Sequence, residues 1–194
     1  MYREYLDIAY QQATPNHKEQ GKYWYQDAHE KVRAISAIYG KDFEIVAAIV
    51  SVLSVGVRWD RNIAETQLLC DSLARGREVP RKNISSYNKQ IDKAVALWKQ
   101  KDLANVETII GKGDKTLNFY RAICEPQGDH VVVDRWILRA AGYTKPNFPK
   151  SKPYRDISTA IRDIAENVSL CPPEVQATIW VSVRERKEDK GEVD

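Results

Sequence analysis

The spacing of hydrophobic positions predicts a chain made almost entirely of helices. Apolar residues recur at helical spacing from Gly21 to Tyr39, and the pattern stops at Gly40, a residue type common at helix C-termini. The segment from Asp42 to Val55 is mostly apolar, and its length favours a buried central helix over a strand. The remaining predicted helices cover residues 62–74, 83–100, 103–110, 115–124, 134–142, 156–168 and 173–183. The expected fold class is therefore all-α.

Two segments lack a helical pattern. Residues 144–153 hold three prolines and are expected to form a loop. Residues 184–194 are charged, lack apolar anchors and are expected to form a disordered tail. We therefore expect one domain over residues 1–183. Within it, the helix expected over 83–100 has a basic face opposite an apolar one composed of Ile84, Tyr87, Ile91, Ala94, Val95 and Trp98.

Composition indicates an ordinary globular protein, with 194 residues, 43% of them hydrophobic and 29% charged. No apolar run approaches the roughly 18 residues that span a bilayer, and the first residues do not resemble a signal peptide. The three cysteines are odd in number and far apart, which indicates a reduced, cytoplasmic protein. We therefore expect neither membrane association nor disulfide bonds.

Charge is distributed unevenly along the chain, although the net charge is only +3. Residues 75–101 contain eight Lys or Arg and two acidic residues, and residues 134–155 contain six and one. Basic segments of this kind are either solvated helix faces or surfaces that follow a phosphate backbone. Charge alone leaves both interpretations open.

The segment Ile109–Asn118 carries the most specific chemical signal. Gly111 and Gly113 permit a tight hairpin with positive backbone angles, and the helix that follows offers unpaired backbone N–H groups to an anion. Lys115 stands at the start of this helix, and Asp134 follows nineteen residues later, after the apolar run Val131–Val133. A lysine and a carboxylate in this setting indicate amine chemistry beside a bound phosphate.

These motifs resemble those of helix-hairpin-helix DNA glycosylases of the endonuclease III type. The matches to the family's hairpin and to its aspartate segment are Gly111, Gly113, Lys115, Thr116, Asn118, Val133, Asp134 and Arg139. Phe43–Ser54 is similar to the family's early apolar helix, which ends in a Leu-Ser turn lining the base pocket. The resemblance covers about Phe43 to Gly142. Residues 53–62 and 173–180 are closer to a phage-associated branch that is proposed to act on hypermodified pyrimidines.

The resemblance implies a two-lobed helical bundle with a helix-hairpin-helix motif and a central cleft. It implies a DNA glycosylase that flips out a modified pyrimidine and cleaves its N-glycosidic bond, with possible abasic-site lyase activity through a Schiff base. Lys115 would be the nucleophile, with an amine pKa lowered by the helix N-terminus and partial burial, and Asp134 would deprotonate the amine or water and stabilise positive charge on the sugar. The implied phosphate-binding residues are Gly111, Lys112, Gly113 and Thr116. The implied base-pocket or strand-wedge residues are Ser54, Arg58, Trp59 and Asn62.

The chain also departs from the family. Val55 follows Ser54 where the family has a glutamine, which puts the usual damaged-pyrimidine substrate in doubt. Three cysteines cannot ligate the iron–sulfur cluster that many relatives carry, so we expect no cofactor and no metal. Asp134 is also well suited to cap a helix, Trp59 to pack in a core, and Gln176 with Trp180 to link the core to the cleft.

The expected partner is double-stranded DNA, bound by a monomer in the cytoplasm, associated with the nucleoid or, for a phage protein, in the host cytoplasm. Two alternatives stay open from the sequence. One is a phage-type enzyme that processes hypermodified thymine in DNA. The other is a non-catalytic helix-hairpin-helix protein that only binds DNA.

Overall fold

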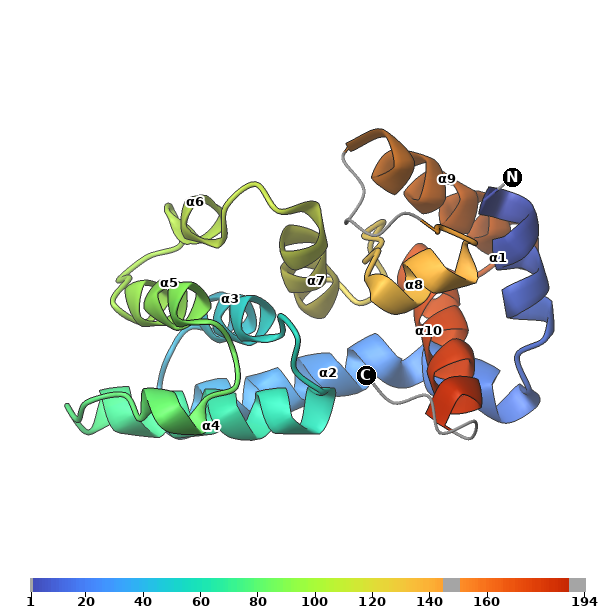
Figure 1. The fold of residues 1–194 in the computed structure, drawn as a ribbon. Helices are drawn as coiled ribbons and strands as arrows, with labels where there is room; N and C mark the ends of the chain where they lie inside the picture. The colour runs from blue at the N-terminus through green and yellow to red at the C-terminus, as the bar shows by residue number, and fades with distance from the viewer. Residues whose placement is uncertain (1, 145–150, 189–194) are drawn as a thin grey trace. The chain divides into compact units, whose positions relative to one another are not determined.

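The computed structural model describes residues 2–144 and 151–188, without the side chains of residues 151, 187 and 188. Within these residues the chain forms ten α-helices, one 3-10 helix and no β-strand, which confirms the all-α prediction (Figure 1). None of the described helices is both long and apolar enough to cross a membrane. The helices are α1 (Tyr2–Gln11), α2 (Pro15–Tyr39), α3 (Phe43–Leu53), α4 (Trp59–Ala74), η1 (Arg81–Asn83), α5 (Asn88–Trp98), α6 (Val106–Ile110), α7 (Asp114–Cys124), α8 (Arg135–Ala140), α9 (Ser151–Val168) and α10 (Pro172–Glu188).

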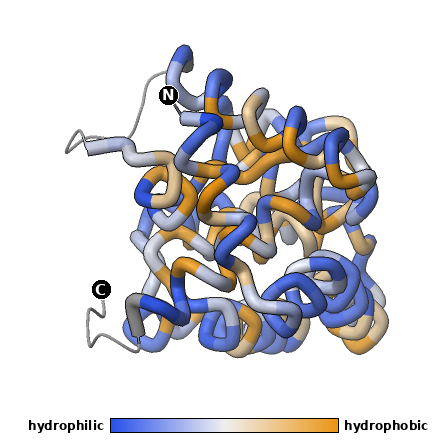
Figure 2. The backbone as a smooth tube through the Cα atoms, turned by 90° about the vertical axis from the view of Figure 1, so that its right-hand side faces the viewer, coloured by the Kyte–Doolittle hydropathy of each residue, from blue (hydrophilic) through white to orange (hydrophobic). Residues whose placement is uncertain are grey.

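The chain divides into two compact units. Unit 1 comprises residues 1–27 and 125–194, and unit 2 comprises residues 28–124, so one boundary falls inside α2 and the other follows α7. In unit 1, α1 packs against α9 and α10, and α8 packs against α10. Apolar and polar positions alternate along the helical tubes (Figure 2). The core of unit 1 is formed mainly by aliphatic side chains, including Leu6, Val133, Ile137, Ile157, Ile161, Val175 and Ile179.

Unit 2 is organised around α3. Nine consecutive residues of this helix, Ile45–Leu53, are buried, and α3 contacts α4, α5, α6 and α7 (Figure 1). The prediction of a central buried helix over 42–55 is confirmed. The preceding helix ends as predicted, because Gly40 adopts φ +57° and the Lys41 N–H donates to the Ser36 carbonyl. The run Ile45–Leu53, apolar at every position except Ser51, therefore reflects burial on every side of the helix.

The N-terminal part of the helix predicted over 83–100 is not helical. Residues 81–83 form a 3-10 turn, the chain then runs extended, and α5 begins at Asn88. The cause is Glu65 of α4, whose buried carboxylate accepts hydrogen bonds from the Ser85 backbone N–H at 2.9 Å and from the Ser85 hydroxyl at 2.6 Å. Tyr87, predicted on the apolar face, is instead 69% exposed at the N-cap of α5.

The Glu65 contact leads to a pH-dependent stability prediction. Burial raises the pKa of Glu65, but hydrogen bonds from Ser85 and Arg61 outweigh it and leave the pKa below its usual value. The folded pKa is thus below the unfolded one, so the stabilisation is present above the unfolded pKa and is lost as pH falls through the folded pKa. Glu65→Gln is expected to lower the free energy of unfolding by about 2 kcal/mol at pH 7, measured by urea titration.

The control for this prediction lies on the same helix. Asp71 forms an exposed i,i+4 pair with Arg75, so Asp71→Asn should cost less than about 0.5 kcal/mol. The difference between wild type and Glu65→Gln should shrink as the titrations are repeated at acid pH. A difference that stays constant down to pH 3 would contradict the assignment of the stabilisation to the ionised carboxylate.

In the C-terminal half, the start of α9 and the end of α10 differ from the predicted helix boundaries. α9 begins at Ser151, so the predicted loop over 144–153 is wrong for residues 151–153, while residues 145–150 lie outside the described part. α10 continues to Glu188, five residues beyond the predicted helix end at Val183. His17 explains part of this extension, because its Nε2 lies 2.7 Å from a Glu185 carboxylate oxygen. Residues 189–194 of the predicted tail lie outside the described residues.

Candidate functional site

The predicted hairpin is a three-residue connection between α6 and α7. Gly111 has φ +88°, a conformation that strongly favours glycine, and its N–H donates to the Glu107 carbonyl at 2.9 Å. Gly113 does not have a positive φ, so the expectation of positive angles at both glycines is wrong for Gly113. Among the described residues, the nearest atom to a Cβ at Gly113 would be the Thr116 hydroxyl oxygen, at 4.0 Å. The turn therefore requires glycine at position 111. At position 113, glycine leaves the hairpin backbone without a side chain over it.

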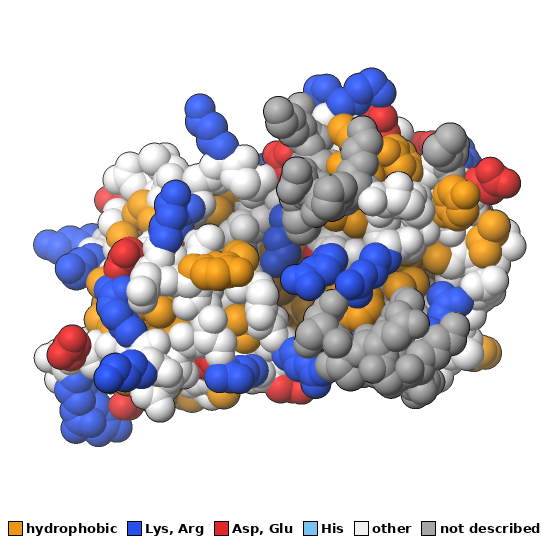
Figure 3. All heavy atoms as spheres, viewed as in Figure 1, with side chains coloured by type: hydrophobic (Ala, Val, Ile, Leu, Met, Phe, Trp, Pro, Cys, Tyr) orange, Lys and Arg blue, Asp and Glu red, His pale blue; other side chains and the backbone are white. Residues whose placement is uncertain are grey.

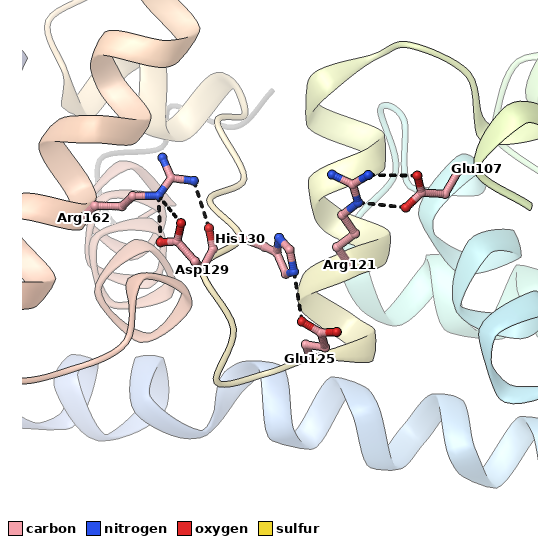
Figure 4. A network of polar contacts seen from close by, with 6 residues as sticks. All are labelled: Glu107, Arg121, Glu125, Asp129, His130 and Arg162. Atoms are coloured by element: carbon pink, nitrogen blue, oxygen red, sulfur yellow. Dashed lines mark hydrogen bonds and ion pairs between the residues drawn. The ribbon is translucent and has the colours of Figure 1, made fainter.

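Two ion pairs lie close to the predicted site segments, one at the hairpin and one just before the Val131–Asp134 segment (Figure 4). In unit 2, the Arg121 guanidinium of α7 donates two hydrogen bonds of 2.8 Å to Glu107 of α6, joining the two helices that flank the hairpin. In unit 1, Arg162 of α9 donates to both the carboxylate and the backbone carbonyl of Asp129. The Arg121–Glu107 pair is bidentate, so it restricts the relative orientation of the two side chains as well as their distance.

Lys115 lies in the first turn of α7 and its side chain reaches the C-terminal end of α3. Its Nζ donates to the Ser54 hydroxyl at 3.0 Å and lies 5.7 Å from the centroid of the Phe119 ring. The Ser54 hydroxyl in turn donates to the Ser51 carbonyl at 2.7 Å. The structure thus brings together two residues that the sequence predicted separately, Lys115 and Ser54.

Aromatic side chains line this part of unit 2. Trp59, at the start of α4, packs edge-on against Phe119 with 6.2 Å between ring centroids, and the Lys31 ammonium lies 6.0 Å from the Trp59 ring. Trp59 is half-buried, and Phe119 is 7% exposed. Phe119 was not predicted as a site residue. Its position four residues after Lys115, on the same face of α7, is the signal that could have identified it.

The other predicted pocket and phosphate residues occupy different environments. Asn62 is 1% exposed and donates its amide to the Val50 carbonyl at 3.1 Å, which links α4 to α3. Arg58 is exposed at the N-cap of α4, and Lys112 is exposed in the hairpin. The Thr116 carbonyl accepts a hydrogen bond from the Ser51 hydroxyl. Asn62 thus joins two helices, while Arg58 and Lys112 are available to a partner.

Asp134 is held in unit 1 by two different donors. It is the N-cap of α8, where Oδ1 accepts from the Ile137 N–H at 2.9 Å, and Oδ2 accepts from the Trp180 indole N–H of α10 at 2.9 Å. The preceding Val131–Val133 run is buried, and the Tyr154 hydroxyl donates to the Val131 carbonyl and accepts from the Val133 N–H. The predicted N-cap role of Asp134 is confirmed, and both carboxylate oxygens have fixed orientations.

A buried polar group lies near Asp134. The Tyr25 hydroxyl donates to the Gln176 side chain at 2.7 Å, and Trp24 packs against Trp180 with 5.5 Å between ring centroids. Burial raises the pKa of Tyr25 well above its usual value, and the negative charge of Asp134 raises it further. Tyr25 therefore stays protonated as a donor. The described residues contain no group of three His, Cys, Asp or Glu side chains arranged to hold a metal ion.

Trp180→Phe tests how firmly Asp134 is held. The substitution keeps an aromatic ring but removes the indole donor, so we expect a loss of about 2 kcal/mol in the free energy of unfolding, measured by urea denaturation. Trp136→Phe is the matched control in unit 1, because the Trp136 indole stacks with Arg139 and makes no hydrogen bond to another described residue. Equal losses for the two variants would show that ring volume, and not the bond to Asp134, is responsible.

The fold and these contacts define an all-helical protein with a partly buried lysine at a glycine hairpin. The chain belongs to the family of unknown function DUF7178, whose model matches residues 2–187. No curated protein and no solved structure matches the chain.

Proposed function

We propose that this protein is a DNA glycosylase-like enzyme that uses Lys115 as an amine nucleophile. The observation that carries the proposal is the contact between the Lys115 amine and the Ser54 hydroxyl, beside the Trp59–Phe119 pair. When the amine is neutral, donation of one N–H to Ser54 leaves the nitrogen lone pair available for attack. The glycine hairpin immediately before α7 and the resemblance to the endonuclease III type support the same reaction.

The proposed reaction replaces one bond at the sugar C1′ with another. The Lys115 nitrogen attacks C1′, the N-glycosidic bond breaks, and the base leaves with the bonding electrons and takes up a proton. The attached nitrogen loses a proton, and the C1′–O4′ bond then breaks, with O4′ keeping the bonding electrons and taking up a proton, to leave an iminium ion between Lys115 and C1′. Loss of a C2′ proton then allows β-elimination, which breaks the C3′–O bond and nicks the strand, and hydrolysis of the imine regenerates the lysine. The proposed lyase activity follows from the same intermediate as base release.

Asp134 has an electrostatic role in this proposal. Two donors, the Ile137 N–H and the Trp180 indole, fix its carboxylate, and a fixed negative charge stabilises positive charge on the sugar as the base departs. The proposal also assigns it the removal of a proton from the amine or from water. These bonds hold the carboxylate in place without requiring further reorganisation during the reaction.

Base flipping assigns roles to the remaining residues. A flipped base requires flat surfaces to stack on, and the gap that it leaves in the duplex requires a side chain to fill it. In the proposal, the Trp59–Phe119 pair supplies an aromatic surface and exposed Arg58 is the strand wedge. Backbone N–H groups at Gly111–Gly113, with the Lys112 charge and the Thr116 hydroxyl, contact a DNA phosphate.

Base release tests this proposal directly. Duplexes containing thymine, an oxidised pyrimidine or a hypermodified thymine are incubated with the protein, and the free base is measured by mass spectrometry. The proposal predicts release of one modified pyrimidine by wild type and loss of that release in Lys115→Ala. Release limited to hypermodified thymine favours the phage-type activity. Binding to every duplex with no base release would contradict the enzyme and favour a DNA-binding protein.

A further inference from the structure

Lys93 joins α5 to the hairpin in unit 2. Its Nζ donates to the Ile110 carbonyl, the last of α6, at 2.5 Å, and lies 3.2 Å from the position that a Cβ on Gly111 would occupy. The ammonium is therefore placed beside the hairpin backbone by a different helix. Nothing in the hairpin motif itself predicts this lysine, because it lies seventeen residues before Ile110 in the sequence.

A second lysine lies one helical turn before Lys93 on the same face of α5. Partial burial lowers the pKa of Lys93, and the positive charge of Lys89 lowers it further. No carboxylate among the described residues forms an ion pair with either lysine. The acidic residue next to Lys93, Asp92, is paired with Arg81 at 2.6 Å. Like charges at i,i+4 destabilise a helix, so this pair carries a cost that a bound anion would remove.

The N-terminal end of α5 continues this positive surface. Tyr87, at the N-cap, is the most exposed large hydrophobic side chain of the described residues, and Lys82 and Lys89 are also exposed. The Arg81–Asp92 ion pair holds the 3-10 turn that contains Lys82 alongside α5. In the space-filling view, Lys and Arg side chains are spread over this face of unit 2 (Figure 3).

We propose that Lys82, Tyr87, Lys89 and Lys93 form a contact surface for the phosphate backbone of double-stranded DNA, which we call the α5 surface and which adjoins the hairpin at Gly111. Lysine ammonium and tyrosine hydroxyl groups are common donors to phosphate oxygens. The choice of DNA as the partner of the α5 surface rests on the proposed function. The surface adds a contact to the DNA backbone, and this contact does not depend on whether the protein catalyses a reaction. Arg81 is excluded from it because Asp92 already neutralises its charge.

Salt dependence of binding measures this surface. Log K falls linearly with log salt, and we call the magnitude of this negative slope the salt slope. Each phosphate contact that is lost lowers the salt slope by about 0.9 for duplex DNA. With a 20-base-pair duplex of unmodified DNA and fluorescence anisotropy between 50 and 200 mM salt, Lys89→Gln should lower the slope by about 1. The double variant Lys89→Gln/Lys93→Met should lower it by about 2 and weaken binding at least tenfold at low salt.

Lys41→Met is the matched control, because the Lys41 Nζ also donates to a backbone carbonyl in unit 2, that of Gln100, at 2.7 Å. It should leave the slope unchanged. Lys93→Arg keeps both charge and donor and should retain the wild-type slope, which separates charge from any loss of hairpin stability. Exposed Lys89 makes no such contact to another residue of the described part of the chain, so its single variant remains informative if Lys93→Met fails to fold.

The outcomes separate this surface from the proposed reaction. If the slope falls in the α5 variants while no base is released from any substrate, the surface is supported and the reaction is not. If the slope is unchanged in Lys89→Gln and in the double variant, the α5 surface is wrong, whatever the result of the base-release assay. A loss of affinity seen only with an RNA duplex would overturn the assignment to DNA.

Discussion

Lys115→Ala is expected to abolish the covalent adduct that wild-type protein forms with an abasic-site duplex in the presence of borohydride. Borohydride reduces the imine between an amine and C1′ to a stable secondary amine, so adduct formation reports the Schiff base directly. The expected loss is at least a hundredfold, to the level of protein-free controls on a denaturing gel. The physical reason is the position of the Lys115 amine. Its Nζ donates to the Ser54 hydroxyl at 3.0 Å and lies next to the Phe119 ring.

Lys112→Ala is the matched control for this experiment. Lys112 lies three residues before Lys115 and is exposed in the hairpin, so it is expected to change binding but not the amount of adduct at saturating protein. Ser54→Ala should keep the amine and reduce the rate of trapping, because the nitrogen loses the acceptor that orients it. Equal adduct yields for wild type and Lys115→Ala would show that a different amine reacts.

Gly21→Ala is expected to destabilise unit 1 by about 3 kcal/mol or to prevent it from folding. Gly21 lies in the interior of α2, where helix propensity alone predicts that alanine stabilises the helix by about 1 kcal/mol. However, α10 approaches so closely that a Cβ at Gly21 would overlap the Thr178 backbone nitrogen, Cα and hydroxyl. Backbone atoms cannot move aside at low cost in free energy. The clash with Thr178 therefore outweighs the gain in helix propensity, and the substitution is destabilising. Thermal or urea unfolding followed by circular dichroism measures it.

Gly113→Ala tests the opposite case. Gly113 does not have a positive φ, and a Cβ there would lie 4.0 Å from the Thr116 hydroxyl, so alanine should change the free energy of unfolding by less than about 0.5 kcal/mol. If Gly21→Ala were as stable as wild type, or more stable, the close approach of α2 and α10 would be contradicted. If Gly113→Ala were strongly destabilising, the description of the hairpin would be wrong.

The parts of the fold that the sequence predicted are those determined by local pattern. The long apolar run of α3 required a buried environment, and Gly40 ended α2 through its own backbone preference. Asp134 capped α8 as its residue type predicts. In each case the information lies within a few residues of the feature.

The errors arise where a distant side chain decides the local structure. The Glu65 carboxylate binds Ser85 and keeps residues 84–87 out of a helix, although their hydrophobic spacing is helical. In the same way, the contact of His17 with Glu185 supports α10 beyond Val183, where the sequence shows only charged residues. Neither partner can be identified from sequence spacing.

The candidate site shows the same division. The sequence predicted Lys115 and Ser54 as separate residues from a family resemblance, but their hydrogen bond depends on how α7 packs against α3. Phe119 was missed because a single phenylalanine in an amphipathic helix suggests core packing. Lys93 was missed because its role depends on the contact between α5 and α6.

The central claim is that the Lys115 nitrogen becomes bonded to the sugar. The most direct test is to trap wild-type protein on an abasic-site duplex with borohydride, digest the adduct with protease and nuclease, and locate the modified residue by tandem mass spectrometry. The proposed mechanism predicts a sugar remnant on Lys115 and on no other lysine. A remnant on Lys112, Lys93 or the N-terminal amine, or no adduct at any protein concentration that binds the duplex, would contradict it.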